Sequence, residues 1–227
     1  MSHTTDTAAP LGSARAFADQ ARSYEKSRQR TQAIAAWQQA MTADPSNADY
    51  PARAGHLKNE IGQPPAAWLP DIDRAIALDA GHANARFDRA LYRYVNNDLA
   101  GARSDIDVAL ARQPDSTRFL GARCVIGAAS DKRAAALEFC ERALRAPDAV
   151  SKANALTSQG QALLELGQSA NALKAFEAAL DTSPRLGRAR YGLGLAKIRL
   201  GDTVAGGADI AEAQSRLAGA GREFRLP

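Results

Sequence analysis

Hydrophobic residues along this chain recur at intervals of three and four positions, which is the spacing of an apolar face on an α-helix. Segments of about a dozen residues with this spacing follow one another, and short breaks separate them, for example at residues 96–98, Gly167 and Gly201. Alanine is abundant and aromatic residues make up only 6%, which favours closely packed helices over a sheet. The pattern therefore predicts an all-α protein built from pairs of short helices.

Two ladders of positions repeat along the chain in the same register. In the first ladder an Ala recurs every 34 residues, stretched once to 35 and once to 36, with a bulky or apolar residue three positions earlier. In the second ladder a small residue stands about twenty positions before each of those Ala residues. The first ladder is Ala40, Ala75, Ala109, Ala143, Ala179 and Ala213, preceded by Trp37, Ile72, Ile106, Cys140, Phe176 and Ile210. The second ladder is Ala21, Gly55, Ala90, Cys124, Gly160 and Gly194. Two ladders in register indicate a tandem array of six units.

The repeat resembles that of the tetratricopeptide family, W-x2-L-G-x2-Y, A-x3-F and then P, over roughly residues 14–220. The A-x3-F pairs are Ala33 with Trp37, Ala102 with Ile106, Ala136 with Cys140, and Ala172 with Phe176. The closing prolines are Pro45, Pro114 and Pro184. The resemblance implies a right-handed superhelical solenoid of about six helix-turn-helix repeats, with the first helix of each repeat lining the concave side.

The six units are expected at about residues 14–47, 48–82, 83–116, 117–152, 153–186 and 187–220. Residues 1–12 lack periodicity and are expected to be disordered, Ser13 is the predicted N-cap of the first helix, and residues 221–227 form a tail. The second helix of the second unit is expected to start late, near Pro70. The fourth unit carries two extra residues around 147–152, and Gly206-Gly207 weakens the helix expected in the sixth. Repeat arrays usually finish with a helix whose outer face is polar. Either the last helix of this chain is polar enough to cap the array, or something covers its outer face.

Composition and charge exclude several classes of protein. With 45% hydrophobic and 24% charged residues the chain is globular. A net charge of +4 and a pI near 9.3 would suit an anionic partner, but acidic and basic residues alternate along almost every segment. The basic region Arg185, Arg188, Arg190, Lys197 and Arg199 has no RNA-binding motif or recognition helix beside it, which makes a nucleic-acid partner unlikely.

The sequence also bears on where the chain resides. No apolar run approaches the length of a membrane span, and residues 1–12 lack the apolar core of a secretory signal. The default expectation is a cytoplasmic protein. A periplasmic location is the alternative if a leader was removed before numbering.

No residues are predicted to carry catalysis, a cofactor or a metal. His3, His56 and His82 are far apart, and none shares a helix with ligands at metal-binding spacing. The Gly192-x-Gly194 pair lacks the third glycine and the preceding strand of a nucleotide site, and there is no G-x-S-x-G motif. The chain is therefore not expected to be an enzyme.

Cys124 and Cys140 occupy the eighth and twenty-fourth places of the fourth unit. In the geometry of the family these places face each other across the two antiparallel helices, so a disulfide is feasible. Two buried free thiols are the favoured interpretation, because no secretion signal is present and free cysteine packs well.

The family frame also indicates a binding groove, formed by the second, fifth, ninth, twelfth and thirteenth places of the first helices. In the first two units these places hold mostly charged residues: Arg15, Arg22, Lys26, Asp49, His56 and Glu60. From the third unit onward they become largely apolar. The predicted partner-binding groove consists of Asn84, Phe87, Leu91, Tyr94, Val95, Val125, Asn154, Gln161, Leu164, Arg188, Tyr191, Leu195 and Ile198.

An apolar strip on the concave face marks a partner site, since solitary proteins rarely expose large apolar patches. The alternatives are that packing between units buries these residues, or that the tail of the chain covers them. The subclass that grips a chaperone's C-terminal carboxylate needs Lys, Asn, Asn, Lys and Arg at set places. Those places hold Ala18, Arg22, Arg53, Asn84 and Asp88, so that activity is not expected.

The expected function is therefore that of a scaffold or adaptor that binds a peptide or protein segment in its groove. Two alternatives remain: a structural subunit or assembly factor of a larger complex, and a regulatory domain cut from an enzyme.

Overall fold

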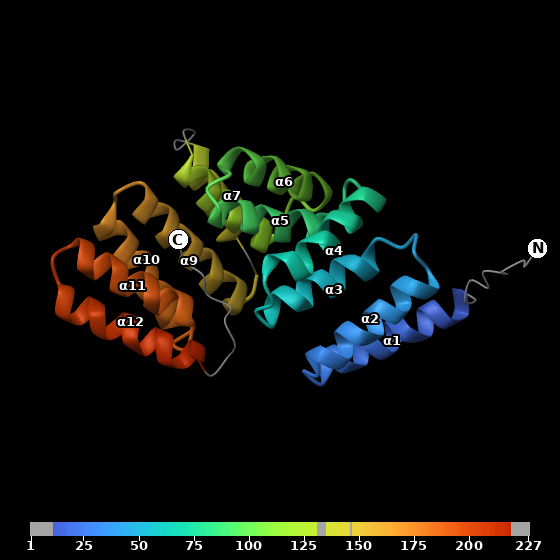
Figure 1. Cartoon of the computed structure of the whole chain (residues 1–227). Helices are drawn as coiled ribbons and strands as arrows, with labels where there is room; N and C mark the ends of the chain where they lie inside the picture. The colour runs from blue at the N-terminus through green and yellow to red at the C-terminus, as the bar shows by residue number, and fades with distance from the viewer. Residues whose placement is uncertain (1–10, 131–134, 146, 219–227) are drawn as a thin grey trace, which may run out of the picture. The chain divides into compact units, whose positions relative to one another are not determined.

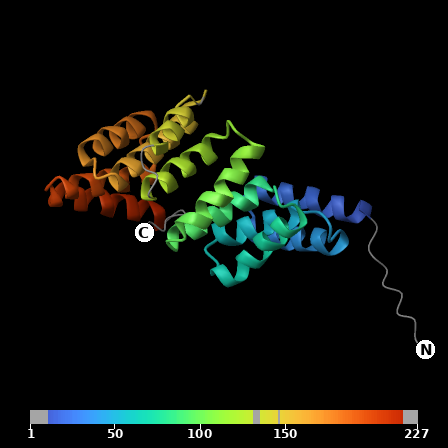
Figure 2. The same ribbon diagram turned by 90° about the horizontal axis from the view of Figure 1, so that it is seen from above.

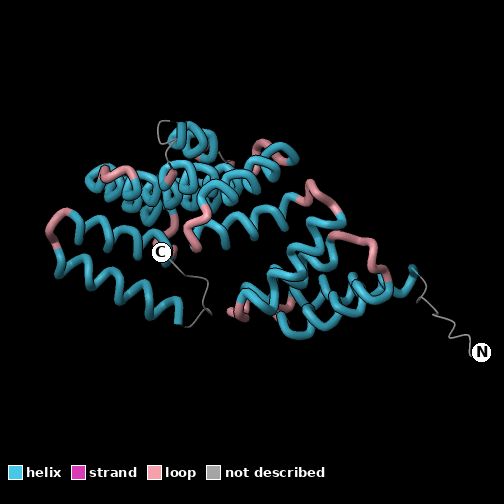
Figure 3. Tube along the Cα trace, turned by 45° about the horizontal axis from the view of Figure 1, so that its top comes forward, coloured by secondary structure: helices cyan, strands magenta, loops and turns pink. Residues whose placement is uncertain are grey.

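A computed structural model describes residues 11–130, 135–145 and 147–218, and this part of the chain is helical and contains no strand (Figures 1 and 3). The helices are α1 (Leu11–Lys26), α2 (Arg30–Ala43), α3 (Asp49–Glu60), α4 (Pro65–Leu78), α5 (Ala83–Val95), α6 (Leu99–Arg112), α7 (Thr117–Ala129), α8 (Ala136–Ala143), α9 (Ala149–Glu165), α10 (Ser169–Thr182), α11 (Gly187–Arg199) and α12 (Thr203–Ala218). The predicted all-α fold of about six helix pairs is confirmed.

The chain divides into two compact units, residues 1–88 and 89–227, with the division inside α5. In the first unit α2 packs against α1 and α3, and α3 packs against α4. In the second unit α7 packs against α6, α8 and α9, α10 packs against α9 and α11, and α11 packs against α12. The red pair α11 and α12 lies side by side in both Figure 1 and Figure 2. Contacts thus run between neighbours in the sequence, as in a repeat array.

Three helix starts differ from their predicted positions. Helix α1 begins at Leu11, so Ser13 lies inside the helix and is not its N-cap. Helix α4 begins at Pro65 and contains Pro70, so the expectation of a late start near Pro70 is wrong. Proline is favoured at the first position of a helix, where its missing N–H would have no partner. Helix α9 begins at Ala149 and takes up the extra residues of the fourth unit, capped by Asp148, whose side chain accepts a hydrogen bond from the Ser151 N–H at 2.8 Å.

The two ladders meet inside the helix pairs, where a small residue on the first helix faces a bulky residue on the second. A Cβ placed on Gly55 would lie 2.9 Å from Ile72 Cδ1, and one on Gly160 would lie 2.7 Å from the Phe176 ring. The bulky partners Ile72 and Phe176 are 0% and 1% exposed. The absence of a side chain on the first helix therefore lets the bulky residue reach the helix backbone.

Glycines in the sixth pair make the closest crossing. A Cβ on Gly194 would lie 2.7 Å from Ile210 Cγ1, and one on Gly206 would lie 2.6 Å from the carbonyl oxygen of Gly194. Gly207, in contrast, is exposed and has no atom within 4 Å of a built Cβ. Gly206 does not weaken the sixth unit as the sequence suggested, because it lets α12 approach α11.

The outer face of α12 is more polar than that of α10. In α10, Leu173, Phe176 and Leu180 pack with residues of α11. One repeat of 34 residues later, α12 has Gly207, Ile210 and Gln214, of which Gly207 and Gln214 are exposed. This composition supports the expectation that the last helix is polar enough to cap the array.

A partly buried ion pair recurs at fixed places in three helix pairs. The acid stands four residues before the ladder Ala of the second helix, and the base stands three residues after the small residue of the first helix. The pairs are Lys58 with Asp71 at 2.6 Å, Arg93 with Asp105 at 2.7 Å, and Lys197 with Asp209 at 2.7 Å. The sequence carried this signal as charges at a constant offset from the ladders, and the pattern analysis missed it.

Asp105 is the most deeply buried of these acids, at 0% exposure. Arg89 binds both of its carboxylate oxygens, at 2.8 and 2.9 Å, and Arg93 binds one of them. Carboxylates bound in this bidentate way are held in strong, charge-assisted hydrogen bonds. The cluster is therefore a structural link between α5 and α6.

We predict opposite effects for the two adjacent glycines of α12. Gly206→Ala should destabilise the protein by about 1–3 kcal/mol, because the new methyl group would overpack against the α11 backbone. Gly207→Ala should be neutral or stabilise by up to about 1 kcal/mol, because Ala favours helix and the site is open. Chemical denaturation followed by circular dichroism measures the free energy of unfolding of both variants. Equal changes in the two variants would contradict the close approach of α12 to α11 at Gly206.

A second prediction concerns the buried aspartate. Asp105→Ala should lower the free energy of unfolding by about 3–5 kcal/mol, because it removes the buried carboxylate that both the Arg89 and the Arg93 guanidinium groups bind. Asp107→Ala on the same helix is the control: it removes the exposed pair with Arg123, so its cost should be only about 0–1 kcal/mol. Similar denaturation midpoints for the two variants would show that the Asp105 cluster does not stabilise the fold.

Candidate partner-binding surface

The thirteen residues of the predicted groove divide between the two compact units. Asn84 and Phe87 lie in the first unit, and the other eleven lie on α5, α7, α9 and α11 of the second unit. We call those eleven residues the first-helix surface, because they lie on the first helices of the third to sixth repeats. The members are Leu91, Tyr94, Val95, Val125, Asn154, Gln161, Leu164, Arg188, Tyr191, Leu195 and Ile198.

Members of the predicted groove differ widely in exposure. Phe87, Val125 and Leu164 are buried, with 6–7% exposure, so they present little area to a partner. Leu91, Val95 and Ile198 are 38%, 39% and 37% exposed, which is high for large apolar residues. The remaining members are intermediate, namely Tyr94, Gln161, Tyr191 and Leu195, or exposed, namely Asn84, Asn154 and Arg188.

Tyr94 connects two first helices that are not adjacent in the array. Its hydroxyl lies 3.3 Å from Glu165 Oε1 and 3.4 Å from Gln161 Nε2, so α5 reaches across to α9. Burial and the neighbouring Glu165 carboxylate both raise the pKa of the Tyr94 phenol, which stays neutral. Both distances are long for hydrogen bonds to a hydroxyl. The Tyr94 hydroxyl therefore already has weak contacts within the protein.

Two residues that were not among the predicted members help to join this surface. Glu165 accepts the Tyr94 contact, and Arg199 Nη1 donates to the carbonyl oxygen of Leu164 at 2.5 Å, which links α11 to α9. Both stand at the thirteenth place of their units, a place that the family frame assigns to the groove. The frame could therefore have identified them.

The charged end of the predicted groove forms a network in the first unit. His56 Nδ1 lies 3.0 Å from Asp88 Oδ2, and His56 Nε2 lies 3.5 Å from Glu60 Oε1. Arg30 donates to the second oxygen of Glu60 at 3.0 Å. The chain of four charged groups joins α2, α3 and α5 within this unit.

The network shifts two pKa values in opposite directions. Burial by itself lowers the pKa of His56, but the hydrogen bonds and charges of Asp88 and Glu60 outweigh it and raise that pKa to about 10. The hydrogen bond from His56, with that from Arg30, lowers the pKa of Glu60 to about 2 against the opposing effect of burial. His56 is therefore a cation and Glu60 an anion near neutral pH.

A second polar cluster of the first unit is centred on Glu25. Glu25 accepts hydrogen bonds from Trp37 Nε1 at 2.8 Å and from Arg53 Nη2 at 2.6 Å. Arg22 lies over the Trp37 ring, with its guanidinium carbon 5.6 Å from the centroid. The charged side chains of Arg22, Glu25 and Arg53 therefore already have partners within the first unit.

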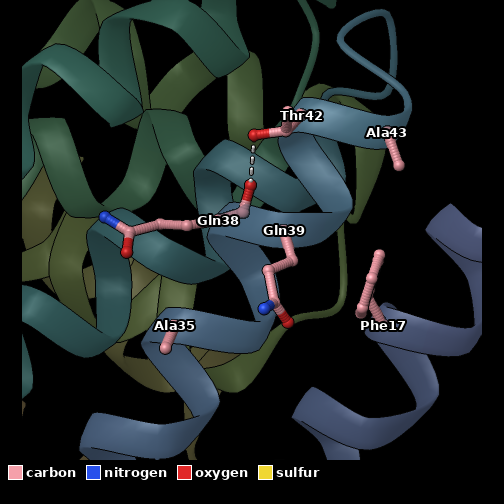
Figure 4. Close-up of a pocket in the computed structure, with 6 residues that line it drawn as sticks. All are labelled: Phe17, Ala35, Gln38, Gln39, Thr42 and Ala43. Carbon is pink, nitrogen blue, oxygen red and sulfur yellow. Dashed lines mark hydrogen bonds between the residues drawn. The ribbon is translucent and has the colours of Figure 1, made fainter. Parts of the chain in front are cut away.

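A hollow lies between α1 and α2, and none of the residues that line it belongs to the predicted groove (Figure 4). Its lining consists of Phe17, Ala35, Gln38, Gln39, Thr42 and Ala43. Thr42 Oγ1 is used within the helix, because it donates to the Gln38 carbonyl at 3.0 Å. The lining residues include no acid, base or thiol, so this hollow offers no group for acid–base or nucleophilic chemistry.

The cysteines are the clearest departure from expectation. Cys124 of α7 and Cys140 of α8 form a disulfide, with Cα atoms 5.4 Å apart, so the favoured interpretation of two free thiols is wrong. Both residues are 0% exposed.

The described part of the chain has neither a metal-binding cluster nor a membrane-spanning helix. Within it, no group of three or more His, Cys, Asp or Glu residues is arranged to hold a metal ion. No helix there is long and apolar enough to cross a bilayer.

Comparison with protein families gives a match over more than half of the sequence. A family model described as tetratricopeptide repeat matches residues 62–117 and 157–221. The matches include the sixth helix pair, where the sequence pattern was weakest. A search of curated proteins found no match to this sequence.

Several solved structures share the fold at low sequence identity. PilW, a type IV pilus biogenesis factor, gives a TM-score of 0.68 at 16% identity, covering 91% of this chain and 92% of its own. PilF of Pseudomonas aeruginosa gives 0.63 at 16%, covering 91% and 90%. A tetratricopeptide repeat protein of Parabacteroides merdae gives 0.62 at 15%, covering 90% and 80%. At these identities the likeness concerns the fold alone.

The His56 network predicts a pH-dependent stability of the first unit. The folded pKa of His56 is about 10, above its ordinary 6.5, so its contribution is full below about pH 6.5 and is lost as the pH rises toward 10. The folded pKa of Glu60 is about 2, below its ordinary 4.5, so its contribution is lost as the pH falls from 4.5 toward 2.

Thermal unfolding between pH 6 and pH 10, followed by circular dichroism, tests the alkaline limb. The melting temperature of the wild-type chain should fall across this range, and His56→Gln should remove most of the fall. His82→Gln is the control, since it replaces a histidine outside the network. If the melting temperature fell equally with pH in His56→Gln and in wild type, the attribution of this pH dependence to His56 would be contradicted.

Proposed function

Because this chain belongs to the tetratricopeptide-repeat family, we propose that it is a protein-interaction scaffold whose first-helix surface binds a peptide or protein segment. Proteins of this family generally mediate protein–protein interactions. One observation carries the proposal for this chain: Leu91, Val95 and Ile198 are each more than one third exposed on that surface. Exposed large apolar side chains on the first helices favour a partner, because their burial would remove apolar area from water.

Continuity of the surface supports a single extended site. Tyr94 connects α5 to α9, and Arg199 connects α11 to α9, so the three helices are joined by side-chain contacts within one compact unit. On α11 Tyr191, Leu195 and Ile198 are spaced at four and three residues, which places them on one side of the helix. A partner with apolar anchors, either extended or helical, matches this arrangement.

The buried residues narrow the proposed site. Phe87, Val125 and Leu164 serve the core, so the contacts with a partner are assigned to the more exposed members. Tyr94 must exchange its contacts with Glu165 and Gln161 before its hydroxyl can bind anything else. Tyr191 and Leu195 on α11 are therefore the better test of binding.

We also infer that the protein works in an oxidising compartment such as the periplasm, the second of the two locations considered from the sequence. The Cys124–Cys140 disulfide supports this, because structural disulfides persist in oxidising compartments and are rare in the cytosol.

The binding proposal predicts a clear difference between two faces of the protein. The folded wild-type protein is used to select binding peptides from a displayed random library. Tyr191→Ala and Leu195→Ala should each weaken the binding of the selected peptides by about 1–3 kcal/mol. Lys174→Ala is the control, because Lys174 is exposed on the second helix α10. Isothermal titration calorimetry measures the affinities, and circular dichroism checks that each variant stays folded.

Wild-type affinity in both α11 variants, with loss of binding in Lys174→Ala, would refute the assignment to the first-helix surface. The alternative function, a permanent subunit of a larger complex, predicts a different behaviour of the purified protein. Such a subunit would aggregate when purified alone, whereas an adaptor would elute as a well-behaved species in size-exclusion chromatography.

A further inference from the structure

The fourth repeat departs from the packing rule that the other repeats follow. In the second, fifth and sixth repeats a glycine of the first helix lies against a bulky residue of the second: Gly55 against Ile72, Gly160 against Phe176, and Gly194 against Ile210. Cys124 stands at the place of those glycines, and Cys140 stands at the place of the bulky residues. The contact that is made by size complementarity elsewhere is made here by a covalent bond.

The cluster in which α8 packs on α7 and α9 is also poor in large side chains. Its buried members are Cys124, Ala128, Ala136 and Cys140, together with Ala162 of α9. The large buried side chains of α7, namely Phe119, Leu120 and Ile126, are not members of this cluster. By comparison, the cluster that joins α9, α10 and α11 contains Phe176 and several leucines. Small side chains bury little apolar area, so hydrophobic packing holds α8, whose buried residues are Ala136, Cys140 and Ala143, less strongly than it holds α10.

The second helix of this repeat is short as well. Helix α8 has 8 residues, whereas α10 has 14. A helix of two turns has few internal hydrogen bonds and depends on tertiary contacts for its stability. Phe139 packs at the edge of this cluster, where Arg123 lies 4.6 Å from its ring centroid, but Phe139 is not fully buried.

We propose that the Cys124–Cys140 disulfide takes the place of the bulky core residue in the fourth repeat and holds α8 on α7 and α9, so that this part of the array is complete only when oxidised. The proposal does not depend on which partner the protein binds. It concerns the middle of the array, where α7 and α8 both pack against α9. Since repeats are stabilised by their neighbours, a loosened α8 would also weaken the support of α9.

Reduction is a balanced exchange with a dithiol such as dithiothreitol. One reagent thiolate attacks a cysteine sulfur, breaks the S–S bond and releases the other cysteine as a thiolate. The second thiolate of the same reagent molecule then attacks the reagent sulfur of the mixed disulfide, and the remaining cysteine thiolate leaves. Two electrons pass to the cysteine pair, two protons end on its sulfurs, and the reagent becomes a cyclic disulfide. Because both sulfurs belong to residues with 0% exposure, α8 must first move away from α7.

Hydrogen exchange followed by mass spectrometry tests the proposal on the full chain. The intact mass under non-reducing conditions should show the loss of two hydrogen atoms. After complete reduction, the amides of residues 136–143 should exchange on the order of a hundredfold faster. Amides of α1 and α2, which belong to the other compact unit, serve as the internal control and should keep their protection.

Two matched double variants test whether a bulky side chain can do what the disulfide does in the fourth repeat. Cys124→Ala/Cys140→Ile introduces the residues of the third repeat, Ala90 and Ile106, at the same two places. It should protect α8 with or without dithiothreitol. Cys124→Ala/Cys140→Ala provides neither the bond nor the bulk, and its α8 amides should exchange as fast as those of the reduced wild type.

Three results would overturn the proposal. The first is two free thiols after incubation with oxidised glutathione, and the second is equal protection of α8 in oxidised and reduced wild type. The third is equal exchange in the two double variants. The wild-type comparison needs no substitution, so it decides the matter even if a variant fails to fold.

Discussion

Contact between a small residue on one helix and a bulky residue on its partner is the interaction on which this structure depends. It brings the two helices of a pair close enough for Ile72 or Phe176 to reach the backbone of the opposite helix. A helix of 8 to 17 residues is marginal alone in water, so this burial stabilises each pair. The same contact, repeated at nearly 34-residue intervals, produces the array.

Polar interactions are added to that contact in ways that vary along the chain. The second, third and sixth pairs contain a partly buried ion pair at equivalent places, while the fifth has Leu163 and Ala175 there. A shifted register between the two helices would separate these charges, and leaving a buried charge without its partner is strongly destabilising. In the fourth pair a disulfide occupies the place of the ladder contact. Each pair thus keeps the same backbone arrangement with different chemistry.

These differences affect the surface available to a partner. The first unit has a charged network around His56 in which the side chains satisfy one another. The second unit has partly exposed apolar residues on α5 and α11, joined through α9. Desolvating a charged network costs more than covering apolar side chains. The second unit is therefore the better candidate for binding.

The sequence by itself determined the all-α class, the six helix pairs and the family, because helical periodicity and a ladder of small residues are local properties that repeat. It also placed Cys124 opposite Cys140 and put Tyr191, Leu195 and Ile198 on one helix face. Only the tertiary structure decided that the cysteines are bonded, that Val125 and Leu164 are buried, and that Gly206 meets Gly194. It also brought Tyr94 to Glu165, 71 residues away. The physical reason is that a repeat pattern fixes the side of a helix on which a residue lies, whereas its depth and partners depend on how closely the next helices approach.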